Sequence, residues 1–96
     1  MQIKQSRFVL MVGILIIYAY MRGYQLTFGD ASRIDSKGHK KDSFHYKRLA
    51  IDLNLFKDGK YLTKTKDHEI LGKFWELLGG SWGGRFNDGN HYSWGE

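Results

Sequence analysis

"RFVLMVGILIIYAYMRGY", residues 7–24, contains an unbroken apolar run over residues 8–21. Arg22 and Gly23 follow the run, and a cation in the last turn before a glycine is typical of a helix C-terminus. Ser6 is predicted to cap the start of the helix. The run is shorter than the roughly 20 residues that span a bilayer, so it predicts a core helix of a small domain.

A signal peptide is the alternative interpretation of this segment. Lys4 and Arg7 would supply its positive N-terminal region. The residues after the run, 18–22, do not form the small-x-small pattern of a cleavage site. We therefore expect a core helix and no stable membrane span, while export through a signal anchor stays open.

Length and composition limit the classes of protein. The 96 residues are predicted to form a single domain, 1–96. There is no cysteine, which excludes disulfides and thiolate metal sites, so zinc would need His and carboxylate ligands. The net charge is +5, and residues 33–48 carry most of the excess. This basic segment is read either as a solvated loop or as attraction to a polyanion such as nucleic acid, anionic lipid or bacterial cell wall.

The middle of the chain has the pattern of a small sheet. Apolar and polar residues alternate over residues 24–28 and again over residues 49–55, which predicts two half-buried strands. Asp58 and Gly59 form a hairpin-turn signal, and residues 60–62 are the returning strand. The stretch between the first two strands is polar, basic and aperiodic, and we interpret it as a loop.

A second helix is predicted to begin near Thr65 and to stop at Gly79 and Gly80. Its expected apolar face consists of Ile70, Leu71, Phe74, Trp75, Leu77 and Leu78. The remaining residues are rich in turn signals, with short extended pieces expected around Trp82 and Tyr92.

The four histidines are not equivalent. His39 lies among lysines and His68 lies in the first turn of the second helix, so both are interpreted as solvated side chains. His45 and His91 each have a carboxylate nearby in the sequence, which makes them the candidates for chemistry.

Spacing restricts how these residues could share a zinc ion. On one straight strand His45 and Asp52 would lie about 23 Å apart on opposite faces, so His45 must fold back from a loop. With His91 as a third ligand, a fourth position would be left for water, as in catalytic zinc sites. Asp88, three residues before His91, would suit a general base toward that water. Spacing alone equally allows Asp88 to be only the polar start of a turn.

Three segments, in this order along the chain, resemble one family. "SFHYKRLAIDLNLF", residues 43–56, resembles the Ser-x-His, six residues, Asp signature of zinc D-Ala-D-Ala carboxypeptidases and L-alanyl-D-glutamate endopeptidases. This is the VanY-like group, which includes many phage endolysins. "LGGSWGGRFNDGNHYSW", residues 78–94, is similar to the second motif, an acidic residue three before a zinc histidine. "GYQLTFGDASR", residues 23–33, resembles the first strand and the arginine after it.

The resemblance implies an α+β fold of the Hedgehog and DD-peptidase type, in which helices pack on a small antiparallel sheet. It implies zinc as cofactor, with the ligands His45, Asp52 and His91. Asp88 would be the catalytic base. Arg33 would hold the substrate and stabilise the developing oxyanion, and Ser43 would lie near the bound peptide.

The expected function is therefore a zinc-dependent peptidase that hydrolyses stem or cross-bridge peptides of peptidoglycan, as a phage lysis endopeptidase. We expect a monomer made in the host cytoplasm and acting at the cell wall or in the periplasm. Carboxypeptidase action on a terminal D-alanine is an alternative within the same chemistry. A non-enzymatic basic module that binds nucleic acid or cell wall is the alternative from another class, although no nucleic-acid motif accompanies the charge.

Overall fold

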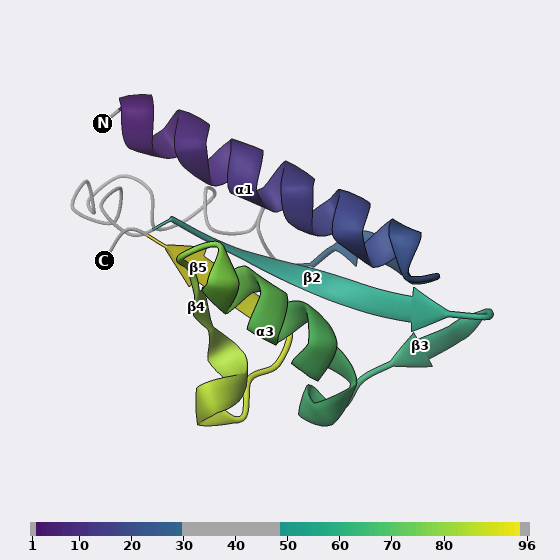
Figure 1. Cartoon of the computed structure of the whole chain (residues 1–96). Helices are drawn as coiled ribbons and strands as arrows, with labels where there is room; N and C mark the ends of the chain where they lie inside the picture. The colour runs from purple at the N-terminus through teal and green to yellow at the C-terminus, as the bar shows by residue number, and fades with distance from the viewer. Residues whose placement is uncertain (1, 30–48, 95–96) are drawn as a thin grey trace.

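A computed structural model of the chain describes residues 2–29 and 49–94. In these residues the protein has the predicted α+β architecture, with helices packed on an antiparallel sheet (Figure 1). The helices are α1 (Gln2–Met21) and α3 (Glu69–Leu77), with two short 3-10 helices, η3 (Thr65–His68) and η4 (Gly83–Phe86). The strands are β1 (Gln25–Phe28), β2 (Leu49–Lys57), β3 (Lys60–Leu62), β4 (Ser81–Trp82) and β5 (His91–Trp94).

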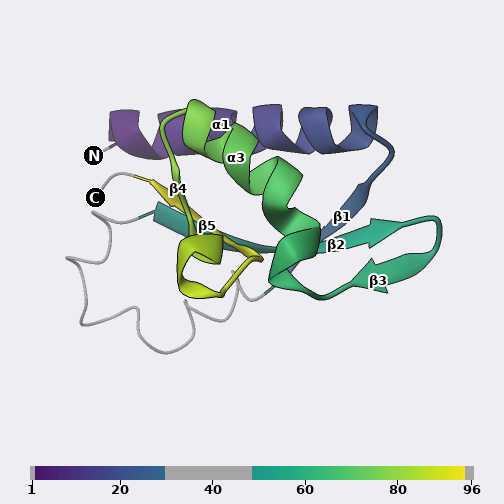
Figure 2. The same ribbon diagram turned by 60° about the horizontal axis from the view of Figure 1, so that its bottom comes forward.

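β2 is the central strand of the sheet. The strand order in the described residues is β1-β2-β5-β4, and β3 pairs with the end of β2. All pairs are antiparallel, and the register aligns Asp52 with His91 and Leu55 with Leu26. The predicted hairpin is confirmed, because Asp58 and Gly59 both have positive φ between β2 and β3. Both helices cover the same face of this sheet (Figure 2).

One side of α1 packs against the rest of the domain. Its inward residues Met11, Val12, Leu15 and Ala19 belong to the buried core. The rings of Tyr18 and Phe74 stack at 3.8 Å and join α1 to α3. The helix already includes Gln2, so the prediction of Ser6 as its N-cap is wrong. Gly23 follows the helix at φ +91°, the left-handed conformation that favours glycine after a helix end.

The second helical segment differs in detail from the prediction. It begins at Thr65 as expected, but its first turn is the 3-10 helix η3 and α3 starts at Glu69. Leu71 and Trp75 are fully buried, whereas Leu77 is 83% exposed, so its predicted place on the apolar face is wrong. Ile70 is likewise exposed.

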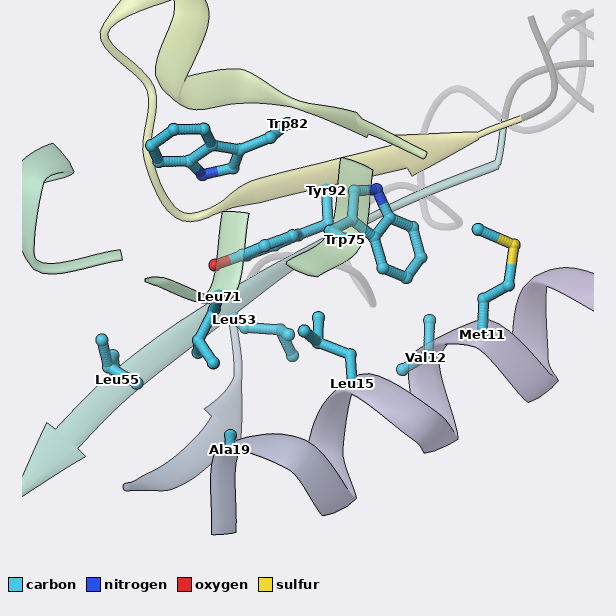
Figure 3. Packing of buried hydrophobic residues seen from close by; sticks show 10 residues of the cluster. All are labelled: Met11, Val12, Leu15, Ala19, Leu53, Leu55, Leu71, Trp75, Trp82 and Tyr92. Atoms are coloured by element: carbon cyan, nitrogen blue, oxygen red, sulfur yellow. The ribbon is translucent and has the colours of Figure 1, made fainter. Parts of the chain in front are cut away.

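The core lies between α1, α3 and the sheet (Figure 3). Its largest fully buried side chains are Trp75 and Tyr92, whose rings meet edge to face at 5.9 Å. Leu53 and Leu55 contribute from β2. Phe28 does not join them, because at the end of β1 it is exposed, although strand alternation predicted it on the inward face with Leu26.

His68 is also part of this interior. It is only 2% exposed, so its interpretation as a solvated side chain is wrong. Its Nδ1 lies 2.9 Å from the hydroxyl oxygen of Tyr92. His68 is the buried residue of η3, so its ring lies inside the domain rather than in solvent.

Candidate active site

The sheet register brings two predicted site residues together. Asp52 on β2 lies opposite His91 on β5, and His91 Nδ1 lies 2.9 Å from Asp52 Oδ1. The neighbouring Leu53 N–H donates to the carbonyl of Asn90 at 2.9 Å. Asp52 and His91 are therefore a non-hydrogen-bonded backbone pair, the kind of pair in which side chains approach most closely.

The pair lies on the face of the sheet away from the helices. Leu53 and Tyr92, the next residues on the two strands, are fully buried on the helical side. Successive side chains on a strand point to opposite faces, so Asp52 and His91 point the other way. Both are partly open, with side-chain exposures of 26% for Asp52 and 33% for His91.

The separation of the two ligand atoms suits a shared zinc ion. Two ligands of a tetrahedral zinc, each bound at about 2.0–2.1 Å, lie roughly 3.3 Å from one another. The observed 2.9 Å between Asp52 Oδ1 and His91 Nδ1 is close to this value. An imidazole nitrogen and a carboxylate oxygen are also donor types that zinc prefers. The two residues thus fit the ion as two of its ligands.

Other predicted residues fall outside the part of the chain that the structure describes. These are Arg33, Ser43 and His45, together with His39. Within residues 2–29 and 49–94 there is no group of three or more His, Asp or Glu side chains that could hold a metal. Asp88 therefore does not join Asp52 and His91 as a third ligand.

Asp88 lies in the turn that leads into β5, and it is exposed to solvent. Its N–H donates to the carbonyl of Gly83 at 2.9 Å, and its carbonyl accepts from the N–H of His91 at 3.2 Å. These two bonds close the turn and set Asp88 directly before the strand that carries His91.

Two further hydrogen bonds hold the same turn from neighbouring elements. The indole Nε1 of the buried Trp82 donates to the carbonyl of Gly89 at 2.8 Å. The N–H of Gly89 donates to Oγ1 of Thr65 on η3 at 3.2 Å. The backbone beside Asp88 is thus tied to both η3 and β4, which reduces its freedom to move.

Glycines allow the close packing around the pair. A Cβ on Gly83 would meet the carbonyl of Asp88 and would lie 2.8 Å from Cβ of His91. Gly29, whose N–H donates to the carbonyl of Asp52 at 2.8 Å, would place a Cβ 3.0 Å from Cβ of Asp52. A side chain at either position would push against the Asp52–His91 pair.

A pocket lies beside Asp88. It is lined by residues of β2, β3, η3 and the turn that precedes β5. Among them are Asn54, Tyr61, Thr65, His68, Asp88 and Asn90. Most of these side chains are neutral hydrogen-bonding groups, which could contact the amides of a peptide.

His68, which lines the pocket, forms a hydrogen bond with the hydroxyl of Tyr92. Burial lowers the pKa of His68, against a smaller opposing effect of the Asp67 carboxylate. Burial raises the pKa of the Tyr92 hydroxyl. Because Tyr92 directly follows His91, this buried bond anchors β5 at the residue next to the site.

Sequence reasoning missed four of these supporting residues. Gly29 directly follows the predicted first strand, and Thr65 is the predicted start of the second helix, so neither carries a signal for a role at the site. Trp82 could have been found, because a buried indole N–H generally needs an acceptor. His68 carried no local signal, since its partner Tyr92 is 24 residues away.

Comparison with protein-family models identifies the family of the chain. Residues 37–94, more than half of the chain, match the M15 peptidase family described as D-alanyl-D-alanine carboxypeptidase. No curated protein and no solved structure gave a significant match. The matched range includes Asp52, Asp88 and His91, and it supports a peptidase that acts on peptidoglycan. The chain belongs to the D-alanyl-D-alanine carboxypeptidase family of M15 peptidases.

Proposed function

We propose that this protein is a zinc-dependent peptidase that hydrolyses stem or cross-bridge peptides of peptidoglycan, as a phage lysis endopeptidase. The observation that carries the proposal is the pairing of Asp52 and His91, whose Oδ1 and Nδ1 lie 2.9 Å apart on an open face of the sheet. Family membership supports the substrate class. The endopeptidase assignment rests on the resemblance to phage endolysins.

Three residues would hold the zinc ion. Asp52 and His91 are the two that the structure brings together, and the family resemblance adds His45. Zinc bound there would supply Lewis acidity that favours attack of water on the scissile carbonyl. The partly exposed pair leaves room for a substrate to approach from the side opposite the helices.

Asp88 would act as the general base. Its carboxylate would take a proton from the attacking water and later pass it to the leaving amine. The turn that carries it is held by bonds to Gly83, Trp82 and Thr65, so the carboxylate would be positioned before the substrate arrives. By resemblance, Arg33 would stabilise the developing oxyanion and Ser43 would contact the peptide.

The test measures zinc content and digestion of purified sacculi on the same preparation. We expect zinc in the parent and mass-spectrometric release of peptide fragments. Asp52→Asn should lose zinc, because an amide is a weaker ligand than a carboxylate. Asp88→Asn should keep zinc and lose roughly 10²- to 10⁴-fold in hydrolysis rate, the usual contribution of a general base.

The matched control is Asp58→Asn in the β2–β3 hairpin. Asp58 has φ +54°, a conformation that asparagine tolerates, and it lies in a turn away from the site. This variant should behave as the parent does. Hydrolysis retained in Asp88→Asn would refute the assigned base, and a parent without zinc or released peptide would refute the proposal.

A second candidate is carboxypeptidase action, which the description of the matched family favours. It would release a terminal D-alanine, whereas the endopeptidase would open stem or cross-bridge peptides. Mass spectrometry of the same digests distinguishes them by the residue released. A strongly salt-dependent gel shift from a protein without zinc would instead favour the basic nucleic-acid-binding module.

A further inference from the structure

The outward side of α1 is apolar from Val9 to Met21. Opposite the core residues, it exposes large hydrophobic side chains, which we call the outer face of α1. Its members are Ile3, Val9, Leu10, Ile14, Ile17 and Met21. Leu10, Ile14, Ile17 and Met21 follow spacings of four and three, so they form one continuous stripe on the helix. A contiguous apolar surface of this kind marks an interaction site, unlike single exposed hydrophobic residues.

The outward side of α3 shows what a solvent-facing helix looks like in the same molecule. Glu69 and Lys73 form an ion pair at 3.2 Å on its surface. Glu76 binds the guanidinium of Arg85, with one contact of 2.9 Å. α3 thus presents charged pairs to water beside its exposed Ile70 and Leu77, whereas the middle of α1, from Phe8 to Met21, presents no charge. The difference indicates that the outer face of α1 is not adapted to water.

Charge indicates which partner the outer face of α1 fits. The only charged residues in the described N-terminal segment, 2–29, are the cations Lys4, Arg7 and Arg22. All three are exposed. Arg7 lies three residues before Leu10 and continues the stripe toward the N-terminus, with Lys4 one turn earlier. The Arg22 guanidinium instead lies 5.1 Å from the centre of the Tyr18 ring, which stacks on Phe74 of α3. Long basic side chains at the ends of an apolar surface can reach lipid head groups while the apolar residues enter the acyl boundary.

We propose that the outer face of α1 docks this protein onto the surface of a membrane that contains anionic lipid, with the helix lying in the interface plane. The apolar stripe supplies the buried area, and Lys4 and Arg7 supply attraction to the head groups. This docking is independent of the proposed peptidase activity.

The packing of α1 favours docking over spanning. By length and composition the segment Ile3–Met21 could cross a membrane, which taken alone is weak evidence. Leu15 and Ala19 are fully buried against the domain, so a spanning helix would have to leave the core. Docking uses only residues that are already exposed and leaves the core intact.

Docking would also orient the molecule. α1 covers the face of the sheet that carries Leu53 and Leu55, while Asp52 and His91 point to the opposite face. The bilayer and the candidate site would therefore lie on opposite sides of the sheet. On the proposed function, the site would face away from the membrane, toward the cell wall.

The test is co-sedimentation of the full chain with lipid vesicles. Vesicles of phosphatidylcholine mixed with phosphatidylglycerol should pellet the protein, and vesicles of phosphatidylcholine alone should bind it more weakly. The double variant Leu10→Ser and Ile17→Ser should partition at least roughly tenfold less, because two large apolar side chains are lost from the contact. The double variant Leu77→Ser and Phe86→Ser, whose positions are at least as exposed but lie outside α1, is the matched control and should bind as the parent does.

A second variant covers the case in which the serine variant fails to fold, as circular dichroism would show. Lys4→Gln with Arg7→Gln should weaken binding to the anionic vesicles and leave the apolar stripe unchanged. Three results would each overturn the proposal: no binding of the parent, equal loss of binding in the control, or parent protein that resists alkaline carbonate extraction. If the parent forms a dimer, does not bind vesicles, and becomes a monomer in the Leu10→Ser and Ile17→Ser variant, the outer face of α1 would instead bind a second copy of this chain. Hydrolysis of soluble peptidoglycan fragments is measured without vesicles. It tests the proposed peptidase function separately from membrane docking, so the failure of one is distinguished from the failure of the other.

Discussion

At the residue scale, the candidate site is held by single hydrogen bonds to buried groups. Thr65 Oγ1 accepts from Gly89, and Trp82 Nε1 donates to the carbonyl of the same residue. Gly89 lies next to Asp88, so both bonds act on the backbone that would position the base. These bonds connect elements that are far apart in the sequence, and their loss should therefore affect both stability and hydrolysis.

Thr65→Val should lower both the stability of the protein and its rate of hydrolysis. The change keeps the shape of the side chain but leaves the buried N–H of Gly89 without its acceptor, at a cost of about 1–3 kcal/mol in the free energy of unfolding. Thr65→Ser keeps the hydroxyl and is the matched control. Urea unfolding and sacculus digestion measure the two effects. Equal losses of stability in Thr65→Val and Thr65→Ser would show that the Thr65 hydroxyl does not hold the turn.

His68 should make stability depend on pH. Its pKa in the folded protein is lowered by burial, so the unfolded chain binds the proton more readily. The free energy of unfolding should therefore fall as pH decreases through about 6.5 toward the folded pKa, by at most about 1.4 kcal/mol per pH unit. Above that range the histidine is neutral in both states and contributes no pH dependence.

Urea unfolding at several pH values between neutral and mildly acidic conditions measures this effect. His68→Gln can still reach the Tyr92 hydroxyl but does not titrate, so its unfolding free energy should be flatter over the same range. A parent and variant with the same pH dependence would contradict the assignment to His68.

At the element scale, α1 has two sides with different roles. Leu15 is fully buried against the domain, whereas Ile17, two residues later, is 62% exposed on the outer face. The apolar run over residues 8–21 therefore serves packing on one side only. Composition alone could not separate the sides, because almost every position is apolar.

Leu15→Ala should destabilise the protein by about 2–5 kcal/mol, the usual cost of truncating a buried leucine and leaving a cavity. Ile17→Ala is the matched control in the same helix and should change stability by no more than about 0.5 kcal/mol. Thermal and urea unfolding of both variants measure the difference. Equal effects would mean that α1 does not pack on the core in solution.

At the scale of the whole molecule, the two faces of the sheet have different roles. Its helical face, with Leu53 and Tyr92, forms the core on which the fold depends. Its other face carries Asp52 and His91, which the register places opposite each other. A ligand that binds this pair binds only the folded chain, because the two residues are 39 positions apart in the sequence.

Zinc should therefore stabilise the whole domain. At a free concentration about 100 times its dissociation constant, a ligand specific for the folded state adds about 2.7 kcal/mol, or roughly 10 °C or more in Tm for a chain of this size. A chelator should reverse the shift. His91→Ala should abolish it, while Asp58→Asn should keep it. Differential scanning calorimetry measures the shift, and a zinc effect that persists in His91→Ala would contradict the assigned ligand.

The sequence by itself determined the fold class, the β2–β3 hairpin and the identity of Asp52 and His91 as a candidate pair. These features depend on local periodicity, on turn residues such as Asp58 and Gly59, and, for the fold class and the candidate pair, on motifs that resemble one family; all are readable along the chain. Arg33, Ser43 and His45 stay predictions, because they lie outside the described residues.

Only the tertiary structure decided which groups meet. The register of β2 against β5, the burial of His68 against Tyr92 and the bonds from Thr65 and Trp82 to Gly89 all join distant parts of the chain. It also decided which side of α1 packs and which side is left apolar and open. Such contacts depend on how helices and strands stack around one core, and a nearly uniform apolar run carries no pattern from which that arrangement could be predicted.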